Sequence, residues 1–149
     1  MAYNDFLISL NQPMYRAVAP GRNPQEASLK PSRASWTGTA STCCALNAET
    51  AYQEFQKHNQ NQNMKMYEIL INDLTAVDLQ AYCSSHGIAP GDCYAGEIDH
   101  TKVIHEFYGQ GVQALIWPSN VGPGQSIVFF PENLHSDQKV IVKSFPFLR

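Results

Sequence analysis

A short stretch that begins at Asn47 constrains the fold more than any other part of the sequence. Asn47 is a favourable helix N-cap. The apolar residues that follow recur at i, i+3, i+4 and i+7, the spacing of one helix face: Ala48, Ala51, Tyr52 and Phe55. Residues 39–46 (TASTCCAL), just before them, are small and compatible with a β-strand. The pattern predicts a central strand that leads directly into an amphipathic helix.

Two polar groups near this strand and helix suit a phosphorylated, ribosylated ligand. At about 100° per residue, Glu54 falls on the flank of the apolar face, roughly 60° from Ala51. The Glu54 side chain can therefore point into a cleft beside the core. The alternative is an ordinary solvated helix carboxylate. Arg33 lies upstream, in a loop bounded by Pro31 and Gly38.

Length and composition narrow the class of protein. The 149 residues suffice for one domain with a core, and 44% apolar against 15% charged residues is typical of a globular chain. The formal net charge is −3, which argues against a protein that binds the nucleic-acid backbone. A local basic excess before residue 34 suits a small anionic ligand instead: Arg16, Arg22, Lys30 and Arg33.

Several kinds of segment and site are not expected. The first ten residues have no basic region and no long apolar run, so we predict no signal peptide, and no stretch is apolar enough for a membrane span. The cysteines form no CxxC pair, and adjacent Cys43 and Cys44 should point to opposite faces of a strand. We therefore expect reduced, buried thiols and assign no metal site.

The remaining pattern predicts a single α+β domain over residues 1–149, with mixed β-sheets and flanking helices. Expected strands or extended segments cover residues 1–10, 12–18, 39–46, 67–72, 113–117, 126–130 and 138–145. One further helix is expected from a capping box at Thr75 and Asp78 to Gly87, and another from Asp99 to Tyr108.

A third element of interest is the segment 117–125 (WPSNVGPGQ). A strand should end at Pro118, present Ser119 at its tip and continue into a glycine turn. A serine in this place can donate a hydrogen bond to a ribose or phosphate oxygen, but without a paired base it is a poor nucleophile. The alternative is a serine that only caps the turn.

Taken together, these pieces resemble the RES domain family, named for its Arg, Glu and Ser. The family's YRxx strand is matched by residues 15–18 (YRAV), and its GGRWNxxG loop by residues 32–38. The xYLAxSPxxAxxE run is matched by residues 43–48 with Ala51 and Glu54 in register. The late PS motif before a glycine-rich turn is matched by Pro118 and Ser119. The resemblance spans about residues 14–134.

The chain departs from the family pattern at three of these positions. Ala34 stands where the family has the tryptophan after the loop arginine, Cys43 where it has the strand tyrosine, and Ala48 where it has the proline that opens the helix.

The resemblance implies a fold similar to ADP-ribosyltransferases and a toxin that consumes NAD by phosphorolysis or hydrolysis. NAD is then the substrate, inorganic phosphate a candidate co-substrate, and no bound cofactor is expected. The implied partner is a neutralising antitoxin or immunity protein, with no nucleic acid or membrane. The implied site of action is the cytoplasm, where the chain acts as a free toxin or as a secreted effector.

The resemblance also assigns roles to individual residues. Arg16 and Arg33 would bind the pyrophosphate or an attacking phosphate, because guanidinium binds phosphate oxygens bidentately. Glu54 would stabilise positive charge on the ribose, and Ser119 would hydrogen-bond the ribose or a phosphate. Tyr15 is expected beside the ligand. Two other functions stay open: protein ADP-ribosylation through the same site, and a non-enzymatic nucleotide-binding or partner-binding module.

Overall fold

The strands of the protein form one sheet in the order β1-β5-β6-β7-β3-β2-β4-β8. The computed structural model describes residues 3–25, 41–89 and 106–147, except for the side chain of residue 58. The strands are β1 (Leu7–Leu10), β2 (Met14–Val18), β3 (Thr42–Ala45), β4 (Lys65–Ile71), β5 (Leu74–Asp78), β6 (Ala114–Pro118), β7 (Gln125–Phe129) and β8 (Val140–Ser144). Neighbouring strands run antiparallel except β5 and β6, which are parallel. The predicted α+β class is confirmed.

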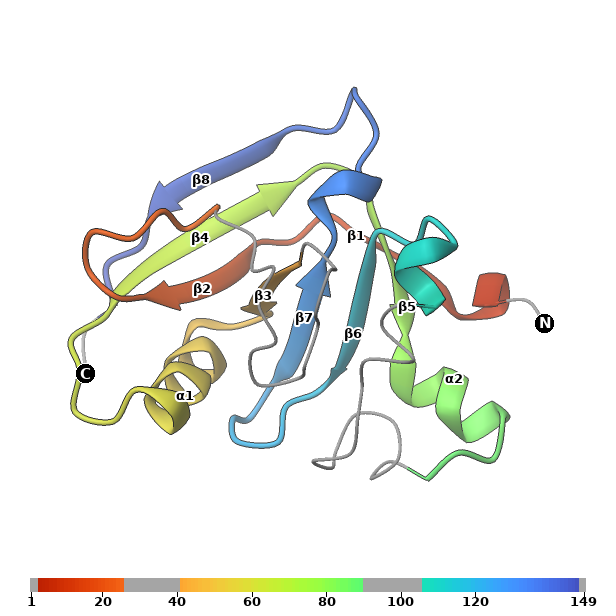
Figure 1. Cartoon of the computed structure of the whole chain (residues 1–149), viewed down its shortest axis with the longest axis horizontal. Coiled ribbons are helices and arrows are strands. Elements are labelled where there is room, and N and C mark those ends of the chain that lie inside the picture. The colour runs from red at the N-terminus through yellow and green to blue at the C-terminus, as the bar shows by residue number, and fades with distance from the viewer. Residues whose placement is uncertain (1–2, 26–40, 90–105, 148–149) are drawn as a thin grey trace.

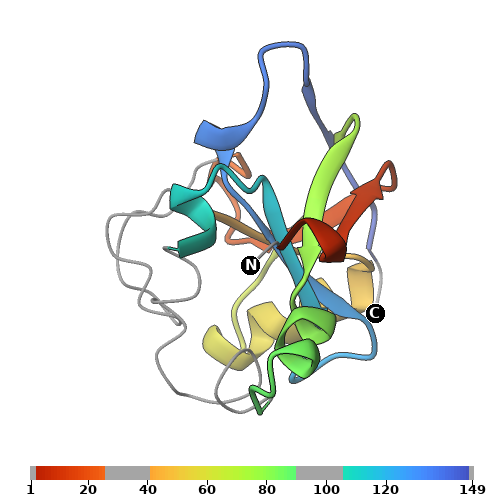
Figure 2. The same ribbon diagram turned by 90° about the vertical axis from the view of Figure 1, so that its right-hand side faces the viewer.

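The link between β4 and β5 shows that the sheet is strongly curled. Only Asn72 and Asp73 separate these two strands, and Asp73 takes a positive φ of 54°. In the sheet, however, β5 is next to one edge and β4 next to the other. The sheet therefore folds back on itself, so that β4 continues into β5 across its concave side (Figures 1 and 2).

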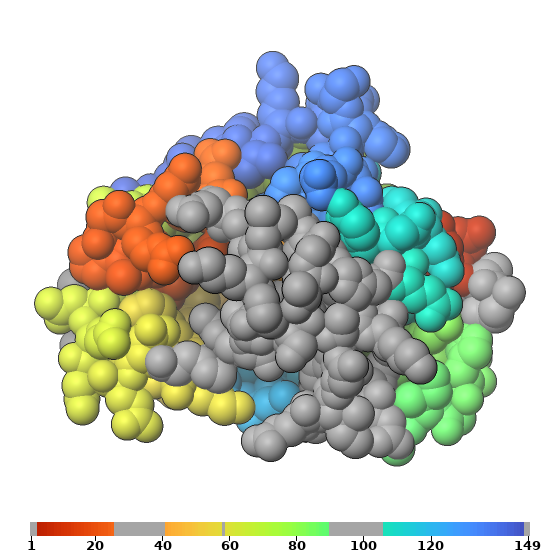
Figure 3. All heavy atoms as spheres, in the orientation of Figure 1, coloured from red at the N-terminus to blue at the C-terminus, as the bar shows by residue number. Residues whose placement is uncertain are grey.

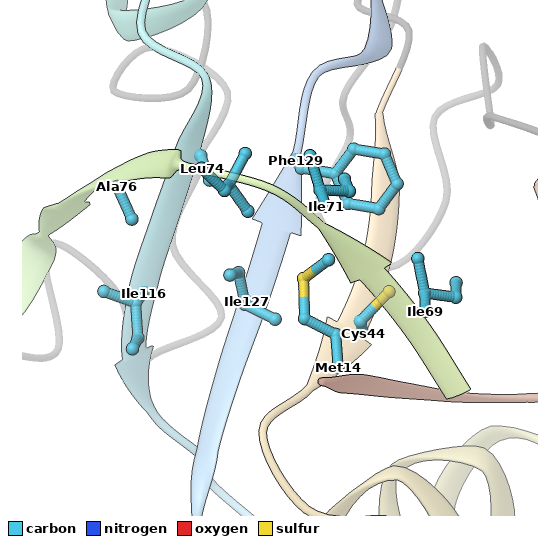
Figure 4. Close-up of a cluster of buried hydrophobic side chains, with 10 residues drawn as sticks. Met14, Cys44, Ile69, Ile71, Leu74, Ala76, Ile116, Ile127 and Phe129 are labelled. Carbon is cyan, nitrogen blue, oxygen red and sulfur yellow. The ribbon is translucent and has the colours of Figure 1, made fainter. Parts of the chain in front are cut away.

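The space inside this curl holds the main apolar core. Figure 4 shows side chains from strands at both ends of the sheet pointing toward one another, among them Met14, Ile69, Leu74 and Ile127. Burial of such a cluster is the dominant favourable term in folding. It also fixes the strands in register, because a slip by one residue would turn the apolar side chains outward.

The helices lie on the convex side of the sheet, below it in Figures 1 and 2. They are α1 (Ala48–His58) and α2 (Leu79–Ser85); residues 106–109 are also helical, and short 3-10 turns cover Tyr3–Phe6 and Pro131–Asn133. Under α1 lies a cluster of buried Ala45, Ala51 and Met66. A second cluster, which includes Val77, Leu115, Val128 and Phe107, packs with α2.

The predicted helix from Thr75 to Gly87 was wrong in its first part, where the structure has strand β5 instead. Thr75 does not open a helix but lies in β5, where its backbone N–H and its hydroxyl both donate to Gln113 Oε1 at 3.2 Å. The N-cap of α2 is Asp78, whose side chain accepts from the Ala81 N–H at 3.1 Å. The buried alternate residues of β5 outweigh the local capping signal, because they pair with β1 and β6 in the sheet.

Candidate functional site

The first turn of α1 is fixed by its cap, as the sequence predicts. The Asn47 side chain accepts a hydrogen bond from the Thr50 N–H at 2.7 Å. Ala51 and Phe55 on the same helix are buried, and Glu54 is half-buried on the flank between solvent and core. The helix therefore holds the Glu54 carboxylate beside the sheet rather than out in solvent.

The turn between β6 and β7 forms a compact unit around Ser119. The Ser119 N–H donates to the Gly124 carbonyl at 3.0 Å, and this hydrogen bond closes the turn. The Ser119 hydroxyl oxygen accepts from the N–H groups of Val121 and Gly122 at 3.2 and 3.1 Å. The expected strand end, serine and glycine turn are thus all present, and they hold the hydroxyl oxygen in one place.

This turn packs tightly against the first turn of α1. A Cβ added at Gly122 would lie 2.8 Å from the Cα of Thr50, and one at Gly124 would lie 2.3 Å from Asn47 Nδ2. Both distances are too short for any side chain. The glycines therefore allow the close approach that brings Ser119 to α1.

The approach brings Glu54 and Ser119, 65 residues apart in the chain, into direct contact. Glu54 Oε2 accepts a hydrogen bond from Ser119 Oγ at 3.0 Å. The same oxygen also accepts from the hydroxyl of Ser126, a buried residue of β7. Hydrogen bonds from two hydroxyl donors to one carboxylate oxygen are charge-assisted, and they fix the orientation of the carboxylate.

The sheet face beneath this carboxylate is identified by strand pairing. Ser126 lies directly opposite Ala45 of β3 and Trp117 of β6, and opposite residues point to the same face. Two residues further along β7, Val128 lies opposite Cys43, so Cys43 shares that face. Trp117 and Cys43 are both partly buried. In the space-filling view, α1 (yellow) and α2 (green) flank the lower edge of the molecule, and atoms of the segment after β6 (light blue) show between them (Figure 3).

Arg16 lies on β2. Its charge and that of Glu54 both influence the pKa of the Cys44 thiol. Burial is the main reason why the pKa of the Cys44 thiol is raised to about 12; Arg16 lowers that pKa, whereas Cys43 and Glu54 raise it. The charges of Arg16 and Glu54 thus act on one buried group. The Arg16 guanidinium also donates to the Pro24 carbonyl at 2.8 Å, which anchors it to the segment after β2.

Tyr15 is placed differently from Arg16. Successive strand residues point to opposite faces, and Tyr15 packs with the cluster under α1, where its ring meets that of Phe145 edge-on at 4.9 Å. Burial, with a smaller effect of Glu68, raises the pKa of Tyr15. Arg33 and Ala34 lie outside the described residues.

Sequence reasoning missed Ser126 as a member of the site. The residue stands at the start of an otherwise apolar run, SIVFF, which predicts a buried strand. A serine in a buried strand needs a hydrogen-bond partner, and this was the available signal. The partner itself could not be named without the tertiary structure.

The cysteines and metal ligands can be assessed for the described residues. Cys43 and Cys44 carry reduced thiols, but Cys83 is disulfide-bonded, so the expectation of reduced thiols throughout was wrong. Cys83 shows no CxxC spacing, so the sequence carried no local signal for this bond. Within the described ranges, no group of at least three His, Cys, Asp or Glu side chains could hold a metal ion, and no helix is long and apolar enough to cross a membrane.

Comparison with known proteins shows the fold. No protein-family model matches the chain, and no curated protein matches its sequence significantly. The structure is similar to a chain in the crystal structure of the M. tuberculosis MbcT–MbcA toxin–antitoxin complex, with a TM-score of 0.76 and 14% sequence identity. The alignment covers 96% of this chain and 89% of that chain. The similarity therefore extends over the whole α+β domain.

Proposed function

We propose that the protein is a toxin that breaks the bond between nicotinamide and ribose in NAD. The observation that carries the proposal is the Glu54 carboxylate, held by the hydroxyls of Ser119 and Ser126 at the junction of α1 and the sheet. The fold shared with a chain of a toxin–antitoxin complex supports a toxin. The order and spacing of the Arg, Glu and Ser motifs support the RES family within that fold.

The chemistry fits a carboxylate that is held in place by two hydroxyl donors. When the C1′–N bond breaks, its electron pair goes to the pyridinium nitrogen, so that nicotinamide leaves as a neutral molecule. The ribose becomes oxocarbenium-like, and a fixed negative charge nearby stabilises it. We assign this role to Glu54. A phosphate oxygen or a water oxygen then forms the new bond to C1′, and a water acceptor gives up its proton to solvent.

Arg16 and Arg33 are proposed to bind the phosphates. Guanidinium offers two parallel donors to a phosphate, and the Arg16 group is already anchored at the Pro24 carbonyl. We propose that one ligand with a phosphate and a ribose engages Arg16 and Glu54 together.

We further propose an antitoxin or immunity protein as the partner. A protein that drains NAD harms the cell that makes it unless it is neutralised. The proposed site of action is the cytoplasm of the producing cell or of a target cell. The disulfide at Cys83 favours a chain that passes through an oxidising compartment, as a secreted effector does.

The test is NAD turnover by the purified protein, with products identified by mass. Wild-type protein should convert NAD to nicotinamide and either ADP-ribose or ADP-ribose-1″-phosphate. Glu54→Gln should lower kcat by roughly two to three powers of ten with little change in KM, because the charge acts mainly in the transition state. Glu106→Gln is the matched control, since Glu106 is also helical but exposed, and it should keep wild-type kcat.

Other outcomes identify the rival functions. If NAD stays intact after prolonged incubation with the protein, the remaining function is that of a non-enzymatic binding module. Labelled ADP-ribose on a protein instead of free product would indicate a protein ADP-ribosyltransferase.

A further inference from the structure

Ser126 is a buried serine whose hydroxyl is directed at Glu54. It lies in β7 with 5% of its surface exposed, between β3 and β6 near the centre of the sheet. Its hydroxyl donates to Glu54 Oε2, the one hydrogen bond of this side chain among the described residues. A central strand is a rigid platform, so the hydroxyl offers the carboxylate a fixed point of attachment.

The Ser119 hydroxyl is already fully used in this arrangement. It has one hydrogen, which is donated to Glu54, and its oxygen accepts from two backbone N–H groups. Ser119 can therefore donate to a ribose or phosphate oxygen only by releasing Glu54. The geometry favours a serine that holds the carboxylate over one that holds the ligand.

The two serines donate hydrogen bonds to the same oxygen of Glu54 from different parts of the fold. Ser119 belongs to the turn after β6, and Ser126 to the strand that follows the turn. A single hydrogen bond leaves a carboxylate able to swing about it, whereas two donors from two segments fix its plane. The charge of Glu54 must be fixed to within a fraction of an ångström to stabilise a developing cation.

We propose that Ser126 is a positioning residue that, together with Ser119, holds the Glu54 carboxylate in its catalytic orientation. The inference deepens the proposed NAD cleavage and rests on it for its kinetic consequence. The alternative is that Ser126 only links α1 to β7 and so adds stability. The two roles differ in what they change: a positioning role lowers kcat, whereas a stabilising role changes the unfolding free energy alone.

The kinetic test compares Ser126→Ala with wild type. Loss of a hydrogen bond to a charged group should reduce kcat about 10-fold to 100-fold while KM changes little. Ser126→Thr keeps a hydroxyl and should restore most of the lost kcat. Ser41→Ala is the matched control and should leave kcat unchanged, because Ser41 is a buried serine whose hydroxyl has no hydrogen-bond partner among the described residues.

A second kinetic comparison isolates the route through Glu54. In a Glu54→Ala background, Ser126→Ala should have no further effect on kcat, because the group that Ser126 positions is already absent. An undiminished effect in that background would overturn the proposal. Wild-type kcat in the single Ser126→Ala variant would overturn it as well.

A crystal structure of Ser126→Ala tests the positioning without any activity. The Glu54 carboxylate should leave its wild-type position or occupy two conformers. A carboxylate that stays in place would overturn the inference even if the wild-type protein proved inert toward NAD. Inert wild-type protein with a displaced carboxylate would instead refute the proposed function and leave the positioning intact.

Discussion

Thr50 Oγ1 accepts a hydrogen bond from the Gly124 N–H at 2.9 Å and so ties the first turn of α1 to the turn between β6 and β7. Thr50 is fully buried, and its own N–H is held by Asn47. The contact brings together the helix that carries Glu54 and the turn that carries Ser119. The geometry of the candidate site therefore depends on groups that need not touch a ligand.

Gly124→Ala should disturb this junction. The new methyl group would lie 2.3 Å from Asn47 Nδ2, so the cap of α1 or the turn must move. We expect a loss of about 1–3 kcal/mol in unfolding free energy, measured by urea denaturation, and a fall in NAD turnover. Gly109→Ala is the control, because no atom lies within 4 Å of its added Cβ. Equal stability of the two variants would show that the junction tolerates movement.

Thr42→Val should stabilise the protein. Thr42 is fully buried in β3, and its hydroxyl has no hydrogen-bond partner in the part of the chain that the structure describes. Valine has nearly the same shape without the polar group, so the unfolding free energy should rise by about 1 kcal/mol. In contrast, Thr75→Val removes a hydroxyl that donates to Gln113, so this variant should lower the unfolding free energy by a similar amount. A lower unfolding free energy for Thr42→Val would mean that the Thr42 hydroxyl forms a hydrogen bond in solution.

The stability of the protein should decrease above about pH 9 because of Cys44. Burial raises the pKa of this thiol from 9.0 to about 12, so the folded state keeps a proton that the unfolded state releases. The contribution of the Cys44 thiol to the unfolding free energy is fully present below pH 9 and is lost as pH rises through about 12. Over this range the unfolding free energy decreases by up to about 1.4 kcal/mol per pH unit. Urea unfolding of wild type and Cys44→Ala across this range should give a steeper slope for wild type. Parallel slopes would contradict the prediction.

Inorganic phosphate should speed NAD consumption and yield ADP-ribose-1″-phosphate. A water acceptor needs no cationic group, whereas the guanidinium groups of Arg16 and Arg33 are proposed to hold an attacking phosphate. Arg16→Lys should weaken the phosphate effect, because an ammonium cannot reproduce the planar two-donor contact. The assay compares NAD loss with and without phosphate at matched ionic strength, since screening alone would weaken a cationic site. A rate indifferent to phosphate, with free ADP-ribose as product, would identify a glycohydrolase.

Local patterns in the sequence were sufficient for most elements. The cap at Asn47 and the apolar spacing after it predict α1, and the glycine turn after Pro118 predicts the loop that carries Ser119. These signals work because capping and helix periodicity act within a few residues. Where local and tertiary signals disagreed, at Thr75, sheet pairing decided the structure.

Only the tertiary structure decided which distant groups meet. The curl of the sheet follows from the pairing of β5 with β6 and of β4 with β2, and no local pattern specifies those partners. The tertiary structure likewise placed Ser126 on Glu54 and turned Tyr15 into the cluster under α1. The sequence by itself therefore determined most of the elements that form and which polar residues were candidates. The packing of α1 against a glycine turn decided which of those residues act together, because contacts across 65 or more residues depend on the global arrangement of the strands.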